Sequence, residues 1–591
     1  MRAGSLLGVF LVAKALLLFG REVEPSPWMP IAYAWQDLLV VFLFVALDLW
    51  GRKRWAGWLL YGLVVAYVAV NLPIARLMST PLTWPMLGAA RVTLADSIVH
   101  HLTLGNLSLA LSVLLTGVAL PFLLKRLQRR ALVIGSILAV PVVFLGPYAS
   151  SRVETLGLDR NVLLVLVTSA IPRVPSRSAS REWRESPLPP DAPSTSQEDL
   201  SGFRGAAARR HVVLVSLESA GAQYLGLYGA AEDPMPNLSR LKDEALVFEN
   251  AYAVYPESIK GLFSVLCSLY PALDVGPEAH GMVKSPSLAS VLSSAGYRTG
   301  LFHSGRFMYL GMDSIVRRRG FDVVEDAGDI GGDHHSSFGV DEPSTVNRIL
   351  SWIDGLNRGE RFFVTYLPIA GHHPYETPGD GPFSGREEIG RYRNALHYGD
   401  QALAKLLEGF RSRGLYQDTL FVIFGDHGEA FHQHDGNYGH TFFLYEENLR
   451  VPYLLVLPGR IHGQVRVGHI ASLLDTAPTV LDLLGLAAPP DFQGASLLGG
   501  LPRMALFFTD YSLGFLGLRD GSWKFVYEIE GSRSKLFNLS SDPGERQDLS
   551  GRFSERAAAY REHLLEWSGS QRELIRRAGQ EGASGNDTSG Q

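Results

Sequence analysis

The chain has 591 residues, a net charge of −5 and a single cysteine, and 46% of its residues are hydrophobic. A negative net charge argues against nucleic acid as a partner, and one cysteine excludes an intramolecular disulfide framework. The length allows several domains. The hydrophobic residues are concentrated in the first quarter of the chain, so we expect a membrane segment followed by folded domains.

Five apolar stretches in the first quarter each approach the roughly 20 residues that a helix needs to cross a bilayer. They are residues 1–20, 31–50, 55–75, 103–124 and 131–149, and we predict a transmembrane helix for each. The first could instead be a cleaved signal peptide, but it carries Lys14, lacks a small-residue cleavage site and leads directly into further spans. Asp37 and Asp48 fall in the second span, where ionisable groups indicate a function such as a lipid path; Asp48 is close enough to the end to be interfacial.

Basic residues in two short loops predict the orientation of these helices. The loops are GRKR at 51–54 and KRLQRR at 125–130, and the excess of Lys and Arg in cytoplasmic loops puts both inside. We therefore expect a multi-pass protein of the cell (inner) membrane with its catalytic domain outside the cytoplasm. A sixth span at 161–172 would reverse this orientation, but that stretch is too short to cross. We expect a membrane-surface helix or a buried strand there.

Composition divides the rest of the chain. Residues 173–207 are rich in proline, serine and charge and poor in aliphatic residues, which indicates a linker. The predicted domains are a transmembrane domain of five helices (1–155), a membrane-proximal segment with the linker (156–207), a catalytic domain (208–500), a small antiparallel C-terminal subdomain (501–552) and a helical, then disordered, tail (553–591).

Short apolar runs alternate with helical patterns after residue 208. The predicted strands are HVVLVSL (211–217), TGLFHSG (299–305), RFFVTYLP (361–368), TLFVIFG (419–425) and PYLLVLPG (452–459), with helices near 236–247, 312–319 and 388–413. The runs are continuously apolar, which is typical of a parallel sheet buried on both faces. We therefore predict an α/β domain with a mostly parallel sheet sandwiched by helices.

Polar side chains follow four of these strands at the point where each strand ends. They are Glu218 and Ser219, His303 and Arg306, His372 and His373, and Asp426, His427 and Glu429. Any one alone is more typical of a surface or capping group. Ligands bind at the carboxyl ends of the strands of an open parallel sheet, however, and carboxylates with imidazoles suit Mn²⁺, Zn²⁺ or Mg²⁺. Together these groups predict a metal site. We expect His432 and His434, in a polar loop, to be solvent-exposed.

The stretch AYAVYPESIKGLFSVLCSLYP, residues 251–271, contains two candidate nucleophiles, Ser258 and Cys267. Pro256, Glu257 and Ser258 have the chemistry of a helix start. A helix N-terminus favours an anion and suits a hydroxyl that must ionise and attack phosphorus or sulfur with the help of a metal. An ordinary helix cap is the simpler explanation of this stretch alone. Cys267 is flanked by leucines, and we predict a buried, inert thiol.

The chain resembles the sulfatase and alkaline-phosphatase superfamily from about residue 211 to 550. The sulfatase signature is a Cys or Ser with Pro two and Arg four residues on and LLTGxYP at its end; laid over SIKGLFSVLCSLYP, it places Ser258 at the nucleophile. Further matching segments are MPNLSRL (235–241), HHPY (372–375), GDHGE (425–429), LYEENLRVP (444–452), DTAPTVLDLLG (475–485) and KLFNLSSDPGERQDL (535–549).

Two departures from the signature carry information. Lys260 and Leu262 stand where the signature has Pro and Arg, which implies that Ser258 is not converted to the formylglycine of true sulfatases. A single Glu218 replaces the Asp pair of the sulfatases, and with a serine nucleophile this is similar to the lipoteichoic acid synthase and phosphoglycerol transferase branch. That branch also has five N-terminal spans and an extracytoplasmic catalytic domain.

The resemblance implies roles for individual residues. By resemblance, Glu218, Ser258, Asp426 and His427 bind one divalent ion, with Mn²⁺ preferred over Mg²⁺, Ca²⁺ or Zn²⁺, and His372 and His440 contact the anionic substrate. Arg306 is a further candidate for binding phosphate, although its segment, HSGRFMYLGMD, aligns with neither branch.

These features predict a membrane-anchored enzyme that transfers or hydrolyses a phosphate-ester group through Ser258. Its expected partners are the lipid bilayer and an anionic ester, lipid-linked or part of the cell envelope. One alternative is a sulfuric ester hydrolase. The other is a catalytically silent membrane receptor, which would be expected to lack a metal ligand or the nucleophile, whereas the sequence retains all of them.

Overall fold

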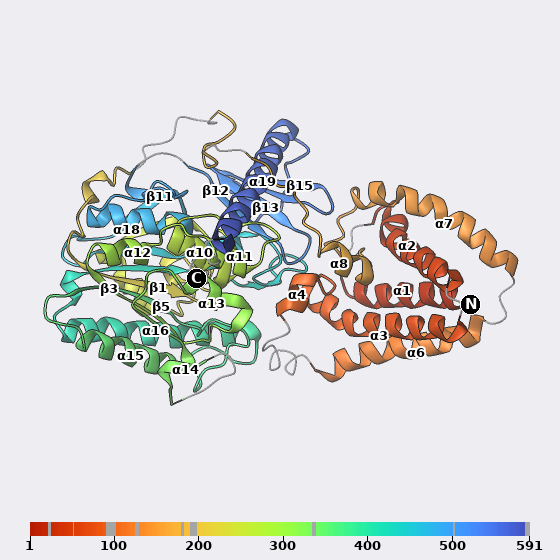
Figure 1. Ribbon diagram of the computed structural model, residues 1–591, viewed down its shortest axis with the longest axis horizontal. Coiled ribbons are helices and arrows are strands. Elements are labelled where there is room, and N and C mark those ends of the chain that lie inside the picture. The colour runs from red at the N-terminus through yellow and green to blue at the C-terminus, as the bar shows by residue number, and fades with distance from the viewer. Residues whose placement is uncertain are drawn as a thin grey trace.

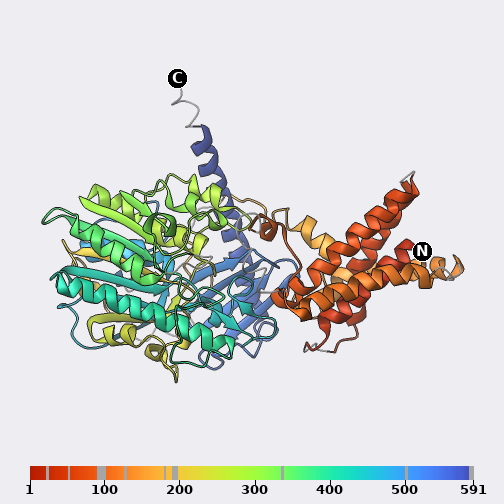
Figure 2. The same ribbon diagram turned by 90° about the horizontal axis from the view of Figure 1, so that it is seen from below.

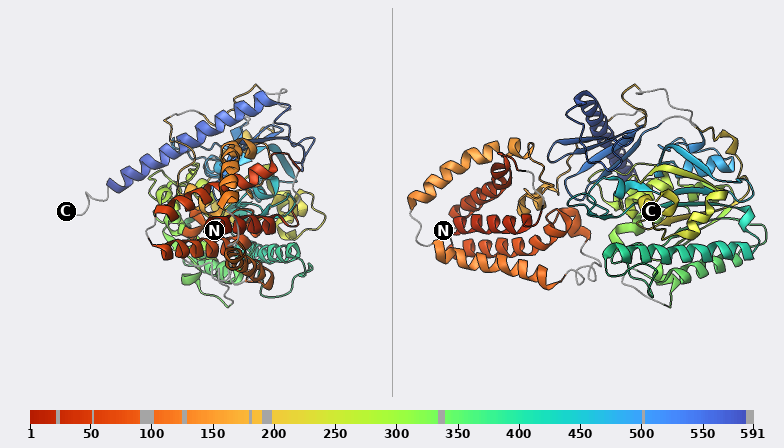
Figure 3. Two further views of the ribbon diagram at one scale, coloured as in Figure 1. Left: turned by 90° about the vertical axis from the view of Figure 1, so that its right-hand side faces the viewer. Right: turned by 180° about the vertical axis from the view of Figure 1, so that it is seen from behind.

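The protein consists of an N-terminal bundle of long helices and a larger α/β body, which meet at one end of each (Figure 1). The computed structural model describes residues 1–21, 25–50, 53–89, 102–124, 129–178, 182–189, 198–333, 339–499 and 503–584. The view from behind shows the same two bodies side by side (Figure 3).

Long helices occupy the five predicted positions in the N-terminal bundle. They are α1 (Arg2–Leu18), α2 (Met29–Trp50), α3 (Arg54–Met78), α6 (Leu104–Leu123) and α7 (Arg129–Ser150). In the described part of the chain, α2, α3 and α6 are long and apolar enough to cross a membrane; α1 has 17 residues, and of α7 the stretch Ile137–Ser150 is described as a shorter apolar helix. The prediction of five spans is therefore confirmed only in part. The stretch 161–172, which is too short for a sixth span, contains the short helix α8 (Val162–Thr168), and Asn161 caps this helix.

An ion pair lies inside the bundle. Lys14 Nζ is 2.8 Å from Asp37 Oδ2, and both side chains are buried. Asn161, at the start of α8, donates a hydrogen bond to the other oxygen of Asp37 at 2.8 Å. The pair therefore joins α1, α2 and α8, and Asp37 has a structural partner. Asp48 is paired with Arg2 at 2.8 Å.

A nine-stranded, mostly parallel sheet forms the centre of the α/β body, as predicted. Its order is β11-β2-β10-β6-β1-β5-β3-β4, with β9 paired to β2, and only β9 and β10 run antiparallel to their neighbours. The strands are β1 (His211–Leu217), β2 (Ala245–Tyr252), β3 (Tyr297–His303), β4 (Val323–Glu325), β5 (Arg361–Leu367), β6 (Thr419–Gly425), β9 (Arg450–Val451), β10 (Tyr453–Val456) and β11 (Val465–Ser472).

Helices cover both faces of this sheet (Figure 1). Val213 and Val215 of β1 pack on one side with α9 (Pro236–Arg240), α15 (Glu342–Asp354) and α16 (Glu388–Ser412). On the other side, Val212 and Leu214 pack with α10 (Ser258–Cys267), α12 (Leu288–Ser294) and α18 (Thr476–Leu484). Because successive strand residues face opposite ways, a continuously apolar run fills both cores. Shorter helices are α4 (Trp84–Ala89), α11 (Pro277–Gly281), α13 (Met312–Val316), α14 (Ala327–Ile330) and α17 (Glu446–Leu449).

A four-stranded antiparallel sheet follows the main sheet, as predicted for the C-terminal subdomain. Its strands are β12 (Ala505–Thr509), β13 (Phe515–Asp520), β14 (Trp523–Glu528) and β15 (Arg533–Asn538), in that order. The long helix α19 (Ser554–Ser584) packs on this sheet through residues such as Tyr560 and Trp567. Its C-terminal end projects from the body (Figure 2). A two-stranded hairpin, β7 (Ala430–Phe431) and β8 (Tyr438–Gly439), extends from the end of β6.

One prediction about the chain between the bundle and β2 is wrong. The predicted helix at 236–247 ends at Arg240, and a turn leads into β2, which is held by pairing with β10 and β11. The predicted linker packs against the α/β body in part of its described residues. Arg184 is 1% exposed, and both terminal nitrogens of its guanidinium bind Asp475. Local composition could not predict this contact, because Asp475 lies 291 residues after Arg184 in the chain.

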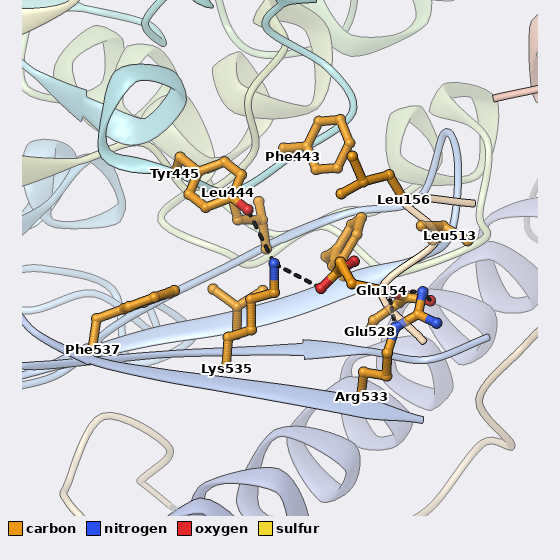
Figure 4. Close-up of a pocket in the computed structure, with 12 residues that line it drawn as sticks. Glu154, Leu156, Phe443, Leu444, Tyr445, Leu513, Glu528, Arg533, Lys535 and Phe537 are labelled. Carbon is orange, nitrogen blue, oxygen red and sulfur yellow. Dashed lines mark hydrogen bonds and ion pairs between the residues drawn. The ribbon is translucent and has the colours of Figure 1, made fainter. Parts of the chain in front are cut away.

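Basic side chains of the C-terminal sheet hold the connection from the bundle (Figure 4). Lys535 Nζ lies 3.0 Å from a carboxylate oxygen of Glu154 and 3.3 Å from the hydroxyl of Tyr445. Arg533 pairs with Glu528 and donates to the backbone carbonyl of Ser150 at 2.9 Å. These residues line a small pocket with largely apolar walls. The bundle and the body are thus joined by packed ionic contacts.

Candidate active site

Two neighbouring strands bring the predicted acidic residues together. β1 and β6 are adjacent and parallel, with Leu217 opposite Gly425, so Glu218 and Asp426 leave the sheet side by side. Ligand atoms of Glu218, Asp426 and His427 all lie within 4.8 Å of one another, and all three side chains are buried. Because ligands bind at the carboxyl ends of parallel strands, the sequence alone was enough to predict that these residues lie together.

Ser258 joins this group from the first turn of α10. Its Oγ donates to Glu218 Oε2 at 3.0 Å and lies 3.3 Å from His427 Nε2. The carboxylate of Glu257 caps the helix by accepting from the backbone N–H of Lys260. Ser258 is thus the first residue of a ten-residue helix, where unpaired amides favour negative charge. Cys267, at the other end of α10, is fully buried, and burial raises the pKa of its thiol.

Backbone hydrogen bonds orient the acidic group and the imidazole. One oxygen of Asp426 accepts from the N–H groups of Ser219 and His427, at 2.9 and 2.8 Å. Nδ1 of His427 lies 3.0 Å from the carbonyl oxygen of Gly428, so Nδ1 carries the proton. The lone pair of Nε2 then faces Ser258 and the two carboxylates, each of which is 3.6 Å away. A neutral imidazole held in this way is the form that binds a metal.

The electrostatics of this group fit a divalent cation. Burial, followed by the charge of Glu218, raises the pKa of Asp426 to about 7. Burial also acts to raise the pKa of Glu218, but neighbouring imidazoles, His427 first, outweigh it and hold that pKa below its usual value. The two carboxylates in turn raise the pKa of His427 against the effect of burial. Without an ion, the protonated form of His427 would be the main compensation for the two buried carboxylates; a divalent ion would stabilise both and leave the imidazole neutral. Oxygen donors with one imidazole suit Mn²⁺ and similar ions.

His440 lies against this group and is oriented by Glu429. Its ring stacks on that of His427 with 4.2 Å between ring centroids. Glu429 accepts from Nδ1 of His440 and from the hydroxyl of Tyr375, both at 2.7 Å. His427, Glu429 and His440 could also hold an ion, but the carboxylate already has two hydrogen-bond donors. We interpret Glu429 as the residue that fixes the orientation of His440. Our sequence analysis listed Glu429 only as a residue that follows a strand and gave it no role. Its position two residues after His427 in GDHGE could have indicated a role in the site.

Replacing Glu429 by glutamine is expected to lower kcat by about 10- to 100-fold, the usual cost of losing a group that orients a site histidine. The rate of turnover as a function of substrate concentration measures this loss. Glu447→Gln is a matched control, because Glu447 makes the same kind of contact with His434, at 2.7 Å. An equal loss in both variants would contradict a specific role for Glu429.

The remaining predicted site residues lie at different distances from this group. His372 follows β5, and its imidazole is among the neighbouring groups that lower the pKa of Glu218. Arg306 follows β3 and is only partly buried, and its guanidinium lies beside Gly328. Among the described residues, Arg306 has no hydrogen bond or ion pair with the residues around Ser258. His303 is a buried histidine that bonds to the carbonyl of Leu367, and burial lowers its pKa.

One prediction about the surface histidines is wrong. His434 is buried rather than solvated, because it pairs with Glu447 and stacks on Tyr445 with ring centroids 3.7 Å apart. His432, in the same loop, is exposed as predicted.

Comparisons with known proteins agree with this fold. Residues 210–486 match the family model described as Sulfatase. Arylsulfatase K of Mus musculus is 28% identical over 242 residues, which cover 36% of this chain and 43% of that protein. A lipoteichoic acid synthase-like protein, YvgJ of Bacillus subtilis (strain 168), is 24% identical over 332 residues, which cover 52% of each chain. The chain thus spans about half the length of the curated relatives it matches.

Solved structures show the same fold. The lipoteichoic acid synthase LtaP from Listeria monocytogenes superposes with a TM-score of 0.54 at 19% identity, and the match covers 65% of this chain and 96% of that one. A Vibrio parahaemolyticus protein in the alkaline phosphatase superfamily has a TM-score of 0.54 at 21% identity and covers 67% of this chain and 95% of its own. The α/β body therefore has the alkaline-phosphatase fold. Within that class, residues 210–486 are similar to the Sulfatase family, and the chain is similar to a lipoteichoic acid synthase-like protein and to arylsulfatase K.

Proposed function

We propose that this protein is a membrane-anchored, metal-dependent enzyme that transfers or hydrolyses a phosphate-ester group through Ser258. The observation that carries the proposal is the position of Ser258 Oγ, 3.0 Å from Glu218 and 3.3 Å from His427 at the start of α10. A receptor that had lost catalysis would not be expected to keep nucleophile and candidate ligands in contact.

The choice of phosphate over sulfate rests on the first turns of α10. Lys260 is paired with Asp510, 2.6 Å away, and Leu262 is buried in an apolar cluster. Neither residue supplies the signature arginine beside the nucleophile. The unmodified hydroxyl of Ser258 suits attack on phosphorus with loss of an alcohol.

In the proposed mechanism, Ser258 Oγ attacks the phosphorus of the ester in line with the departing oxygen. The ester bond breaks, the alcohol leaves and a phosphoryl-serine forms. A divalent ion held by Glu218, Asp426, His427 and Ser258 would lower the pKa of the hydroxyl and offset charge on the phosphoryl oxygens. His440, fixed by Glu429, and His372 would stabilise the charge on the nonbridging oxygens. An acceptor alcohol or water then attacks phosphorus and releases Ser258.

The N-terminal bundle supports a substrate at the membrane. Three of its described helices are long and apolar enough to cross a bilayer, and we place the α/β body outside the cytoplasm from the basic loops. The similarity to proteins named lipoteichoic acid synthases favours an anionic, lipid-linked or cell-envelope ester. The similarity to arylsulfatase K favours the second candidate, a sulfuric ester hydrolase.

The test uses the full chain, purified in detergent and reconstituted with Mn²⁺. Chromogenic phosphate monoester, phosphodiester and sulfate ester substrates are assayed side by side, with glycerol added as an acceptor in a second series. We expect turnover of a phosphorus ester, and a transferase would give a glycerol adduct in place of free phosphate. Faster turnover of the sulfate ester would favour the second candidate. No turnover and no metal binding would contradict both.

A further inference from the structure

The first turn of α10 is held from two opposite sides. Residues two apart in an α-helix point about 200° away from each other around its axis, so Ser258 and Lys260 face opposite ways. Ser258 faces Glu218, whereas Lys260 Nζ lies 2.6 Å from Asp510 Oδ2. The side chains of Lys260 and Asp510 are 9% and 5% exposed. A buried ion pair therefore lies behind the nucleophile, outside the group of candidate metal ligands.

Asp510 is the centre of a closed polar network. It follows β12 and accepts hydrogen bonds from the hydroxyl of Tyr255 at 2.6 Å and the backbone N–H of Asp274 at 2.8 Å, besides Lys260. Lys260 Nζ also lies 4.9 Å from the centre of the Tyr255 ring. Burial acts to raise the pKa of Asp510, but Lys260 outweighs it and holds that pKa low. Each partner is fixed by the others, so the network resists displacement of Lys260.

The chain leaving the bundle holds the other side of this network. Arg173 is paired with Asp274 at 2.6 Å and donates to the backbone carbonyls of Asp510 and of Ser512, the latter at 2.8 Å. Arg173 comes a few residues after α8, which packs on α2. The position of the Asp510 segment therefore depends on the segment that follows the bundle.

A second arginine extends the contact into the bundle itself. Arg160 binds Glu530 at 3.0 Å, the hydroxyl of Ser512 at 3.1 Å and the hydroxyl of Thr80, two residues past α3, at 2.6 Å. A continuous set of buried polar contacts thus runs from the end of α3 to the first turn of α10.

We propose that Lys260 is a positioning residue for Ser258, and that it fixes the rotation of α10 by tying its first turn to a polar joint formed by Asp510, Asp274 and Arg173. The inference rests on the proposed role of Ser258 as nucleophile. Lys260 touches neither substrate nor metal in this role. It determines where the hydroxyl lies relative to the phosphorus it attacks, and a displacement of 1 Å at a reacting group costs about 10²-fold in rate.

The first test is Lys260→Met in the full chain, which keeps the length of the side chain and removes the ammonium group. We expect kcat for the phosphorus ester to fall by about 10²-fold, with KM unchanged. Asp510→Asn should lower kcat in the same way, and the double variant should be no worse than either, since both changes remove one contact. Arg173→Gln, further from α10, should have a smaller effect of the same kind.

Lys535→Met is the matched control, because Lys535 is an ion-paired lysine of the same subdomain that touches the connection from the bundle but not α10. It should leave kcat within about threefold of the wild type, because its contacts do not reach α10. Equal kcat in wild type and Lys260→Met would overturn the inference, as would a loss of kcat that only follows a loss of folded protein.

Hydrogen exchange at the backbone amides of α10 separates this inference from the proposed function. Faster exchange in the first turn of α10 in Lys260→Met, with no change in α16, supports the positioning role even if the wild type turns over no phosphorus ester. Unchanged exchange in α10 would contradict it. Absence of turnover in the wild type would contradict the proposed function alone.

Discussion

Alanine in place of Ser258 is expected to lower turnover of a phosphate ester by at least about 10³-fold, because the attacking oxygen is lost while the rest of the site remains. The hydroxyl bridges Glu218 and His427, and no other hydroxyl among the described residues is hydrogen-bonded to both. The fold should be unaffected, since the helix cap is supplied by Glu257. The measurement is the rate of product release from the full chain under Mn²⁺ saturation, with thermal unfolding as the check on folding.

Cys267→Ala is the control for this variant, because Cys267 lies on the same helix and was the other candidate nucleophile. It is fully buried in an apolar cluster with Leu266 and Phe263. We expect its replacement to leave the rate unchanged within about threefold and thiol reagents to have no effect on the folded enzyme. Activity that survives in Ser258→Ala but disappears in Cys267→Ala would reverse the assignment of the nucleophile.

Removal of the divalent ion is the second large effect. After exhaustive chelation we expect turnover to fall by at least about 10³-fold and to return with Mn²⁺, since a metal contributes several kcal/mol of charge stabilisation in such reactions. Mn²⁺ should also raise the thermal unfolding midpoint of the wild type, because a ligand that binds only the folded state stabilises it.

Asp426→Asn should remove both responses to Mn²⁺, because it replaces a carboxylate of the candidate ligand group with a neutral amide. The matched control is Asp418→Asn: Asp418 is exposed just before β6, at the end of the strand opposite to Asp426. Mn²⁺ should activate and stabilise that variant as it does the wild type. Full turnover in Asp426→Asn after chelation would rule out this group as the metal centre.

The parts of the site that follow directly from strands and helices could be predicted from sequence. Glu218 and Asp426 each come immediately after a buried strand, and a parallel sheet brings such residues to one edge. The helix-start neighbours of Ser258 predicted its place at a helix N-terminus, and the resemblance to the sulfatase signature assigned it as the nucleophile. In each case the position depends on a few consecutive residues, so the local pattern was sufficient.

The parts that depend on distant contacts could not be predicted. Glu429 and His440 meet because the β7–β8 hairpin folds back, and His434 is buried by Glu447 from beyond the same hairpin. Arg184 lies in a segment whose composition is that of a linker, and its burial depends on Asp475. A polar residue is predicted to be exposed unless the residue that pairs with it is known. A single sequence without an alignment does not identify a partner that is distant along the chain.

The ionic contacts between the bundle and the C-terminal sheet have a consequence for which molecules the enzyme can reach. Lys535 with Glu154, and Arg533 with the carbonyl of Ser150, fasten the body directly to the end of the bundle. With the bundle in the bilayer as proposed, Ser258 is held at a set height above the lipid surface. The enzyme would then select its substrates by reach as well as by chemistry. An ester close beneath a lipid headgroup and one at the tip of a long polymer would not be equivalent, even with identical reacting groups.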